Sequence, residues 1–152
     1  MIDPSEDGIS HINVYSKGKT ELGRYLTNFG ECYVDTDHGN FRTVEGYWYW
    51  LACHDDRLRH TDGWESKKLG RELRVPDWPK LDNFERYIMQ AIMNKMVRPW
   101  CTEELIKTGK LPFYHYYVYN GRVIMPKDGL WMINLMTEFR DELVKNEKAK
   151  KD

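Results

Sequence analysis

One carboxylate stands at the head of an aromatic run in this sequence. Residues 43–50 read Thr-Val-Glu-Gly-Tyr-Trp-Tyr-Trp, so that Glu45 opens a segment that is otherwise apolar and aromatic. Such a run predicts a buried helix, and an acid inside it is costly unless another group uses or neutralises it. Because burial raises the pKa of a carboxyl group towards neutrality, Glu45 is the candidate catalytic residue for proton transfer. The alternative is a core helix in which Glu45 pairs with a nearby Lys or Arg.

Other residues near this run have the chemistry of a nucleotide site. Asn28 and Phe29 precede it, Lys68 and Arg71 follow it three positions apart in a predicted helix, and Trp78 stands in Pro-Asp-Trp-Pro. Aromatic rings stack on planar ligands, and an Arg on a helix face can hold phosphate groups. A carboxylate beside a sugar ring suits glycosidic cleavage, whose transition state resembles an oxocarbenium ion. For the two cations the alternative is an ordinary solvated basic face.

The sequence lacks the motifs of several other enzyme classes. It has no nucleophile elbow, Walker loop, Gly-x-Gly-x-x-Gly fingerprint or His-Glu-x-x-His motif. The three cysteines are widely spaced, and neither they nor the five His form a set with metal-ligand spacing. His54-Asp55-Asp56 fits a solvated loop better than a metal site. We therefore expect no metal, no cofactor and no thiol catalysis.

Composition limits the organisation of the chain. A chain of 152 residues is most simply one domain, and its formal net charge of −1 gives no basic field for binding duplex nucleic acid. The aromatic share of 14% favours a binding cleft. The sequence shows neither a membrane-spanning run nor a signal peptide, so we expect a cytoplasmic protein with reduced thiols. It does not indicate whether the protein self-associates.

Periodicity and turn signals predict an α+β fold, a compact and largely helical single domain with small antiparallel β pieces and no βαβ rhythm. We expect a disordered segment at 1–10, the domain at 11–145 and a charged tail at 146–152. Strands are expected at 11–15, at 31–35 and 40–43 around Asp-His-Gly, and at 113–119 and 122–125 around Asn-Gly. Helices are expected at 44–53, 65–73 and 81–97, from an N-cap at Thr102 to Gly109, and after Gly129, with a loop at 74–79.

Short motifs follow one another in a recognisable order. They are Leu-Thr-Asn-Phe at 26–29, Thr-Val-Glu at 43–45, Lys-Lys-Leu-Gly-Arg at 67–71, Trp78, then Met89, Ala91, Lys95, Leu105, Thr108-Gly109 and Arg140. In this order and spacing, from about Ile12 to Leu143, the chain resembles the NADAR superfamily, also called YbiA-like N-glycosidases. The resemblance implies a YbiA-like domain that hydrolyses N-glycosidic bonds. Members act on ribosylamino-pyrimidine intermediates of riboflavin synthesis or remove ADP-ribose from guanine in nucleic acid.

The resemblance also implies roles for individual residues. The functional Glu of the family falls on Glu45 and its active-site Trp on Trp78, while its Asn-Phe and Gly-Arg motifs fall on Asn28, Phe29, Gly70 and Arg71. The chain departs from the riboflavin-type enzymes after Glu45, where Gly46 and aromatics replace a His, a Gln and a Lys. It also has Leu-Pro-Phe-Tyr-His-Tyr-Tyr-Val-Tyr-Asn-Gly at 111–121 in place of a Gly-rich segment. These departures favour ADP-ribosylated guanine as the substrate.

The leading hypothesis is an ADP-ribosylglycohydrolase acting on modified guanine in DNA or RNA, with an antitoxin role against ADP-ribosyltransferases. Glu45 activates water or stabilises the ribosyl cation, and Trp78 stacks on a ring together with Tyr47 or Trp48. Arg71 and Lys68 hold the pyrophosphate, and Asn28 bonds a sugar or phosphate. His115 is either a further site residue or an ordinary strand residue. The alternatives are an N-glycosidase acting on phosphoribosylamino-pyrimidines and a non-catalytic ADP-ribose-binding module.

Overall fold

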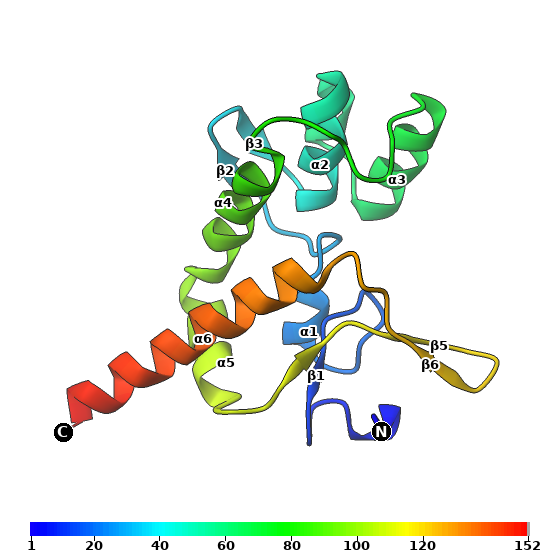
Figure 1. The fold of residues 1–152 in the computed structure, drawn as a ribbon. Coiled ribbons are helices and arrows are strands. Elements are labelled where there is room, and N and C mark those ends of the chain that lie inside the picture. Colours follow the sequence, from blue (N-terminus) through cyan, green and yellow to red (C-terminus); the bar gives the residue numbers. More distant parts are fainter. Residues whose placement is uncertain (152) are drawn as a thin grey trace. The chain divides into compact units, whose positions relative to one another are not determined.

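The computed structural model describes residues 1–151, which divide into two compact units. Asn28–Met96 form one unit, which holds Glu45 and most of the candidate site residues. Met1–Thr27 and the residues from Val97 onward form the other. Figure 1 shows both units as ribbons, with most of their helices and strands labelled. The predicted α+β class is confirmed, since helices predominate and every sheet is a two-stranded piece.

The unit of residues 28–96 combines one β-hairpin with three α-helices. Its elements are β2 (Val34–Thr36), β3 (Gly39–Phe41), α2 (Val44–Cys53), a 3-10 turn η2 (Asp56–Arg59), α3 (Gly63–Glu72) and α4 (Phe84–Met96). The strands β2 and β3 pair antiparallel, with Val34 opposite Phe41, so the hairpin predicted around Asp-His-Gly is confirmed. The helices α3 and α4 each pack against α2, and α4 also packs against β2.

Helix α2 occupies the predicted segment, because a polar cap and a reversed backbone define its two ends. The Thr43 hydroxyl accepts a hydrogen bond from the Gly46 N–H at 3.0 Å, which satisfies a donor of the first turn. His54 ends the helix in the left-handed conformation with φ of 55°, and its N–H donates to the Trp50 carbonyl. Between these ends nearly every side chain is buried, so α2 is the central helix of its unit.

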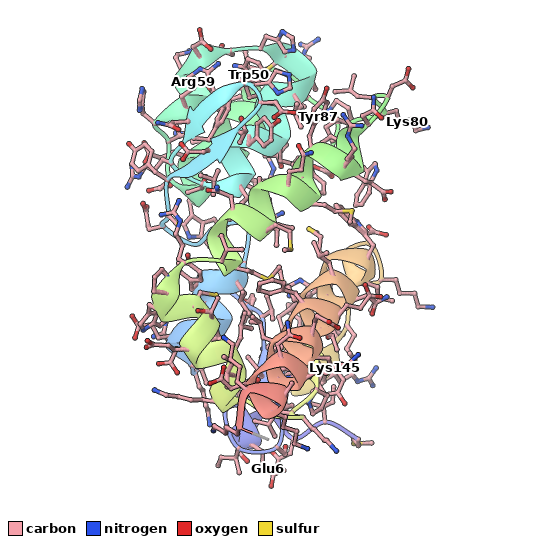
Figure 2. The ribbon with its side chains drawn as sticks, turned by 90° about the vertical axis from the view of Figure 1, so that its left-hand side faces the viewer. Glu6, Trp50, Arg59, Lys80, Tyr87 and Lys145 are labelled. Carbon is pink, nitrogen blue, oxygen red and sulfur yellow. The ribbon has the colours of Figure 1, made fainter. Side chains whose placement is uncertain are left out.

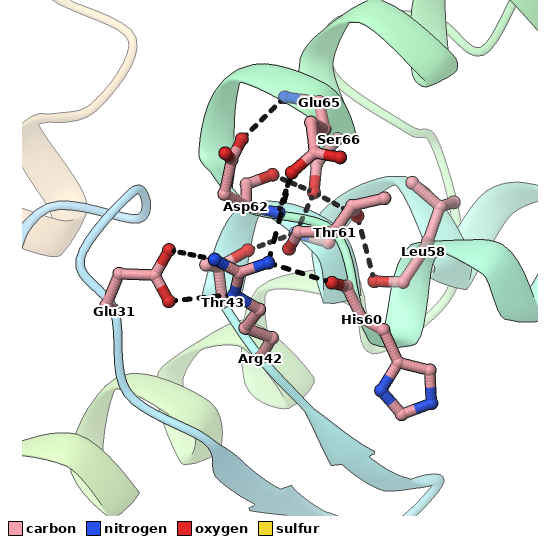
Figure 3. Close-up of polar contacts among 10 residues, drawn as sticks. Glu31, Arg42, Thr43, Leu58, His60, Thr61, Asp62, Glu65 and Ser66 are labelled. Carbon is pink, nitrogen blue, oxygen red and sulfur yellow. Dashed lines mark hydrogen bonds and ion pairs between the residues drawn. The ribbon is translucent and has the colours of Figure 1, made fainter.

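Helix α3 begins two residues before its predicted start because Asp62 and Glu65 form a capping box. The Asp62 carboxylate accepts from the Glu65 N–H at 2.8 Å, and the Glu65 carboxylate accepts from the Asp62 N–H at 3.2 Å. Figure 3 shows this cap beside Arg42, whose guanidinium donates to both carboxylate oxygens of Glu31 and to the His60 carbonyl. These contacts fix the segment between the hairpin and α3.

Helix α4 begins at Phe84 and not at Leu81, because Asn83 has φ of 65° and cannot continue a right-handed helix. The predicted apolar stripe is buried at Phe84, Ile88 and Ile92. Its outer residue Met89 stays exposed.

The hairpin end of this unit carries an aromatic cluster. The Arg59 guanidinium lies 4.9 Å from the centre of the Trp50 ring, and the two side chains lie together in Figure 2, where Tyr87 is also labelled. His38 contacts both Trp50 and Tyr87, with ring centres 5.1 Å and 4.9 Å away. The cluster ties the hairpin turn to α2 and α4.

The other unit combines short strands with three α-helices. Its elements are η1 (Pro4–Glu6), β1 (Ile12–Asn13), α1 (Glu21–Leu26), α5 (Pro99–Lys107), β4 (Phe113–Tyr114), β5 (Tyr117–Tyr119), β6 (Arg122–Ile124) and α6 (Leu130–Lys151). The predicted hairpin around Asn-Gly is confirmed as β5 and β6. The buried Arg140 on α6 donates to the Thr108 hydroxyl at 2.9 Å and to the Leu111 carbonyl at 2.8 Å, so two sequence motifs meet there.

The structure differs from the sequence expectations at several places in this unit. Strand β1 pairs in parallel with β4, so the small sheets are not all antiparallel. Residues 1–10 include the turn η1, and the buried Asp7 accepts hydrogen bonds from the Asn13 and Lys19 N–H groups. Helix α5 begins at Pro99, whose fixed φ suits the first turn, and not after Thr102. Most of the predicted charged tail continues α6, and residue 152 lies outside the described residues.

No helix within residues 1–151 is long and apolar enough to cross a membrane.

Candidate active site around Glu45

Glu45 lies in the first turn of α2, and its backbone is bonded to the segment that precedes the hairpin. Its N–H donates a hydrogen bond to the Asn28 carbonyl at 2.9 Å. The first-turn N–H groups of a helix have no partner within the helix, so this bond satisfies one of them. The Asn-Phe and Thr-Val-Glu motifs, well separated in sequence, therefore meet at the start of α2.

The carboxyl group of Glu45 is shifted towards its neutral form. Burial raises its pKa from the ordinary value of 4.5 to about 7, and the nearby Asp77 acts in the same direction. Lys67 and a hydrogen bond from Tyr49 lower the pKa, but they do not offset the loss of solvation. At neutral pH both protonation states of Glu45 are therefore populated, which is the condition that general acid–base catalysis needs.

Tyr49 follows Glu45 by four residues and so lies on the same face of α2. Burial first, and then the charge of Glu45, raise the pKa of the Tyr49 hydroxyl well above its ordinary value of 10. The hydroxyl therefore stays protonated and serves as the hydrogen-bond donor to the carboxyl group. Tyr49 thus restricts the orientation of Glu45.

One face of α3 lies against this pair and is formed by Lys67, Gly70 and Arg71. A Cβ atom on Gly70 would lie 2.7 Å from Cδ1 of Tyr49, so the α3 backbone approaches the tyrosine ring too closely for any larger residue. Lys67 lies near enough to lower the pKa of Glu45, and Arg71 acts likewise on Tyr49. Two cations therefore stand beside the Glu45–Tyr49 pair.

Lys68, which the sequence analysis paired with Arg71, is exposed on α3 and adjoins Lys67. Neighbouring residues on a helix point in directions about 100° apart, so Lys68 is turned away from the direction of Lys67. Lys68 is not among the charges that act on the pKa of Glu45. Lys67 is the cation that the structure brings to the carboxyl group.

Phe29 packs under the first turn of α3. A Cβ atom on Gly63 would lie 2.4 Å from Cγ of Phe29, so the ring contacts the helix backbone directly. Its edge also meets the exposed Trp64, with ring centres 4.8 Å apart. Phe29 thereby anchors the segment whose Asn28 carbonyl accepts from Glu45.

The loop between α3 and α4 brings Trp78 over α2. The indole of Trp48 donates to the Asp77 carbonyl at 2.8 Å, and the Trp48 and Trp78 rings meet edge to face at 5.1 Å. Phe84 contacts both rings, with centres 4.7 Å and 5.9 Å away. Trp48 is buried in this cluster, whereas Trp78 keeps part of its surface exposed. Trp78 is therefore the ring that can stack on a ligand.

Tyr47 lies in the core of the unit. Its side chain is fully buried, and its hydroxyl lies 2.8 Å from Nδ1 of His38 in the hairpin turn. Burial raises the pKa of this hydroxyl to about 12, so it remains protonated. Because Tyr47 is two residues after Glu45, it points to a different side of α2.

His115 belongs to the other unit, where it precedes β5. Its Nδ1 lies 2.8 Å from the Val14 carbonyl oxygen, which accepts a hydrogen bond only if Nδ1 carries the proton. In the neutral ring Nε2 is then the hydrogen-bond acceptor. Together with Met125 and Lys127, His115 lines a pocket of about 230 Å³ in that unit.

Three residues of the site were not identified from the sequence, namely Tyr49, Lys67 and Asp77. Tyr49 could have been found from its position four residues after Glu45. Lys67 could have been found because it is four residues after Gly63 and three before Gly70, which places it on the glycine-bearing face of α3. Asp77 carries no local signal, since only the folded loop brings it near Glu45.

Within the part of the chain that the structure describes, no three His, Cys, Asp or Glu side chains gather in an arrangement that could hold a metal ion. Cys32, Cys53 and Cys101, all within the described residues, form no disulfide bond.

Comparison with known proteins identifies the fold. No model of a known protein family matches the chain, and no curated protein matches it in sequence. Among solved structures, the NMR structure of the Escherichia coli protein YbiA superposes on it with a TM-score of 0.64 and 15% sequence identity. The match covers 96% of this chain and 95% of YbiA. The chain therefore has a YbiA-like fold throughout.

Proposed function

We propose that this protein is an N-glycosidase that releases ADP-ribose from ADP-ribosylated guanine in DNA or RNA. The observation that carries the proposal is the carboxyl group of Glu45, held at a pKa of about 7 beside the hydroxyl of Tyr49. The YbiA-like fold and the order of the sequence motifs support the choice of an N-glycosidic bond. The departures from the riboflavin-type pattern after Glu45 favour ADP-ribosylated guanine.

The proposed reaction is a hydrolysis at the anomeric carbon of the ribose. Water oxygen forms a bond to this carbon while the bond to the guanine nitrogen breaks, and the bonding electrons leave with that nitrogen, which takes up a proton. The Glu45 carboxylate accepts the proton of the attacking water and stabilises the positive charge that develops on the sugar. Tyr49 keeps the carboxylate in position through its hydrogen bond.

Each surrounding residue is assigned to a part of the substrate from its chemistry and its position beside Glu45. Arg71 and Lys67, with Lys68 at the edge, hold the pyrophosphate through charge-assisted hydrogen bonds. Trp78 stacks on a base, supported by the buried Trp48. The side chain of Asn28 bonds a sugar or phosphate oxygen.

Four of the sequence candidates have a positioning role in this proposal. Phe29 and Gly70 set the distance of α3 from α2, and Tyr47 and Trp48 keep α2 in the core.

The direct test is incubation with an oligonucleotide that carries ADP-ribosylated guanine, with free ADP-ribose as the readout. We expect the wild-type protein to release ADP-ribose and Glu45→Gln to lose turnover, because the amide cannot accept the proton. Glu72→Gln is the matched control, since Glu72 is an exposed carboxylate on α3 and should leave turnover unchanged.

Two results would redirect the assignment. Tight binding of ADP-ribose by the wild-type protein without any release would favour a non-catalytic binding module. Release from a phosphoribosylamino-pyrimidine, with none from the modified oligonucleotide, would favour the riboflavin-type substrate. A Glu45→Gln variant that melts early yet still releases ADP-ribose would show that Glu45 is a structural ion-pair partner.

A further inference from the structure

The β5–β6 hairpin presents aromatic side chains to solvent. Tyr117 pairs with Ile124 and Tyr119 with Arg122, so these four side chains share one face of the hairpin. The tyrosines are 37% and 65% exposed, and Arg122 is exposed as well. Figure 1 shows the hairpin projecting from β4 and α6 of its own unit. Two exposed rings and a guanidinium therefore share one face of the hairpin.

The hairpin turn holds this face in a fixed register. Asn120 and Gly121 have φ of 49° and 73°, which are the left-handed conformations that a type I′ two-residue turn requires. Because the turn matches the twist of the two strands, the spacing between Tyr119 and Arg122 is set by the backbone. The surface is therefore preorganised.

The hairpin segment carries only positive charge. Residues 111–127 contain Arg122 and Lys127 and no Asp or Glu, although the whole chain has a formal net charge of −1. Both cations are exposed. An acid-free aromatic segment in a chain rich in acidic residues is complementary to a polyanion.

A pocket of about 230 Å³ lies at the base of the hairpin. Its walls include Phe113, His115, Met125, Lys127, Leu130 and Ile133. Sites for drug-sized ligands usually measure roughly 300–1,000 Å³, so this pocket is suited to a single ring system. The mostly apolar walls, with the imidazole of His115 as a polar group and Lys127 as a cation, have the chemistry to hold one nucleobase.

We propose that the β5–β6 hairpin and the pocket at its base bind single-stranded nucleic acid. Exposed rings on which bases stack, combined with cations for the backbone, are the features of single-strand binding surfaces. Paired bases would not expose the faces that Tyr117 and Tyr119 need. This inference deepens the proposed function and rests on it for one point, that the modified guanine belongs to a strand and not to a free nucleotide.

The test is the affinity of the full chain for a short, unmodified, fluorescein-labelled single-stranded DNA of mixed sequence, measured by fluorescence anisotropy. We expect Tyr119→Thr, which keeps a good strand former but removes the ring, to weaken binding about fivefold or more. Tyr119→Phe keeps the stacking surface and should bind like the wild-type protein.

Salt dependence separates the role of the cation from that of the ring. Removing one phosphate contact to a single strand reduces the slope of log K against log salt by about 0.7, so Arg122→Ala should show this change. Tyr119→Thr should leave the slope as it is. Tyr33→Ala and Arg57→Ala are the matched controls, since both residues are exposed in the other unit, and neither should change binding.

Several outcomes would overturn the inference. They are an absence of single-strand binding at low salt, a preference for the matching duplex, or equal losses in the control variants. Self-association of the wild-type protein that Tyr119→Thr abolishes would mean that the face contacts a second copy of the chain.

The rates of ADP-ribose release from two substrates, the modified oligonucleotide and ADP-ribosylated guanosine, distinguish this inference from the proposed function. If both hold, Tyr119→Thr slows release of ADP-ribose from the modified oligonucleotide but not from ADP-ribosylated guanosine. Single-strand binding without release from either substrate refutes the glycosidase and leaves the hairpin surface in place. Release from both substrates at rates that Tyr119→Thr leaves unchanged refutes the hairpin surface alone.

Discussion

The hydroxyl of Tyr49 donates a hydrogen bond to the carboxyl group of Glu45 one turn earlier in α2. The two groups act on each other in opposite senses, since the hydrogen bond lowers the pKa of Glu45 and the charge of Glu45 raises that of Tyr49. Gly70 brings the backbone of α3 against the same tyrosine ring. The position of one helix thus affects the proton affinity of the candidate catalytic group on another.

Replacing Tyr49 with Phe should shift the pH dependence of turnover upwards. The carboxylate of Glu45 is the active form in our proposal, so the rate should rise with pH through a pKa of about 7 in the wild-type protein. Loss of the hydrogen bond removes an interaction worth roughly 1.5 kcal/mol, which corresponds to about one pH unit. The measurement is the pH–rate profile, with recovery of the rate at high pH. A lower rate with an unmoved midpoint would contradict the role of Tyr49.

Replacing Glu45 with Gln should change how stability depends on pH. The folded-state pKa of Glu45 is raised above the ordinary value of 4.5 to about 7. Its contribution to stability is therefore fully present below pH 4.5 and is lost as the pH rises through 7. Because one pKa unit corresponds to about 1.4 kcal/mol, the wild-type protein should lose about 3 kcal/mol relative to the variant over this range.

The measurement is urea unfolding of both proteins at pH 5 and pH 8. The difference between the unfolding free energies of the two proteins changes with pH only through Glu45, since the other carboxyl groups titrate alike in both. A difference in unfolding free energy that is the same at both pH values would show that Glu45 is not shifted.

Replacing Gly70 with Ala should destabilise the unit of residues 28–96. The new Cβ would lie 2.7 Å from Cδ1 of Tyr49, and the ring or the helix must move to relieve the clash. Overpacking of this kind costs about 1–3 kcal/mol. Thermal unfolding would measure it, with Gly129→Ala as the control because its Cβ would meet only Met132 Cε at 3.5 Å. Equal melting temperatures for the two variants would exclude a close contact at Gly70.

Much of the fold could be predicted because its local signals are strong. The aromatic run defined α2, and Asn-Gly defined the β5–β6 hairpin. The parallel pairing of β1 with β4 could not be predicted, since Ile12 and Phe113 meet only through the fold of their unit. Nor could the start of α4, because nothing in the sequence requires the left-handed conformation that Asn83 adopts.

For the candidate site, the motifs pointed to Glu45, Gly70 and Arg71 but not to Tyr49 or Lys67 as site residues. Residue types favoured Lys68 beside Arg71, whereas the structure brings Lys67 to the carboxyl group, because Gly63 and Gly70 determine which face of α3 packs. The ring of Tyr47 attracted a binding role from its type alone, and burial places it in the core. Which face of a helix is buried depends on its partners, and a single helix sequence does not contain them.

Turnover should not require a metal ion. Carboxylate-assisted hydrolysis of an N-glycosidic bond needs no Lewis acid when the desolvated Glu45 supplies the base. We expect the rate of ADP-ribose release to be the same before and after treatment with EDTA. Activity that disappears with EDTA and returns with Zn²⁺ or Mg²⁺ would falsify this prediction.

Replacing Arg71 with Ala should weaken ADP-ribose binding far more than Lys145→Ala or Lys148→Ala. All three residues are exposed, but Arg71 stands on the α3 face beside Tyr49, whereas Lys145, labelled in Figure 2, and Lys148 stand on α6. A guanidinium on a pyrophosphate makes charge-assisted, often bidentate bonds worth roughly 1.5–3 kcal/mol, so affinity should fall about tenfold to a hundredfold. Arg71→Lys keeps the charge but loses the bidentate geometry, so it should show an intermediate loss.

Isothermal titration calorimetry with ADP-ribose would measure these affinities at low and moderate salt. A formed pyrophosphate site predicts a loss confined to Arg71 and a shallow salt dependence. Comparable losses at all three positions, together with a steep salt dependence, would instead indicate diffuse attraction of an anion by surface charge. The assignment of Arg71 to the pyrophosphate would then be wrong, even if Glu45→Gln still abolished turnover.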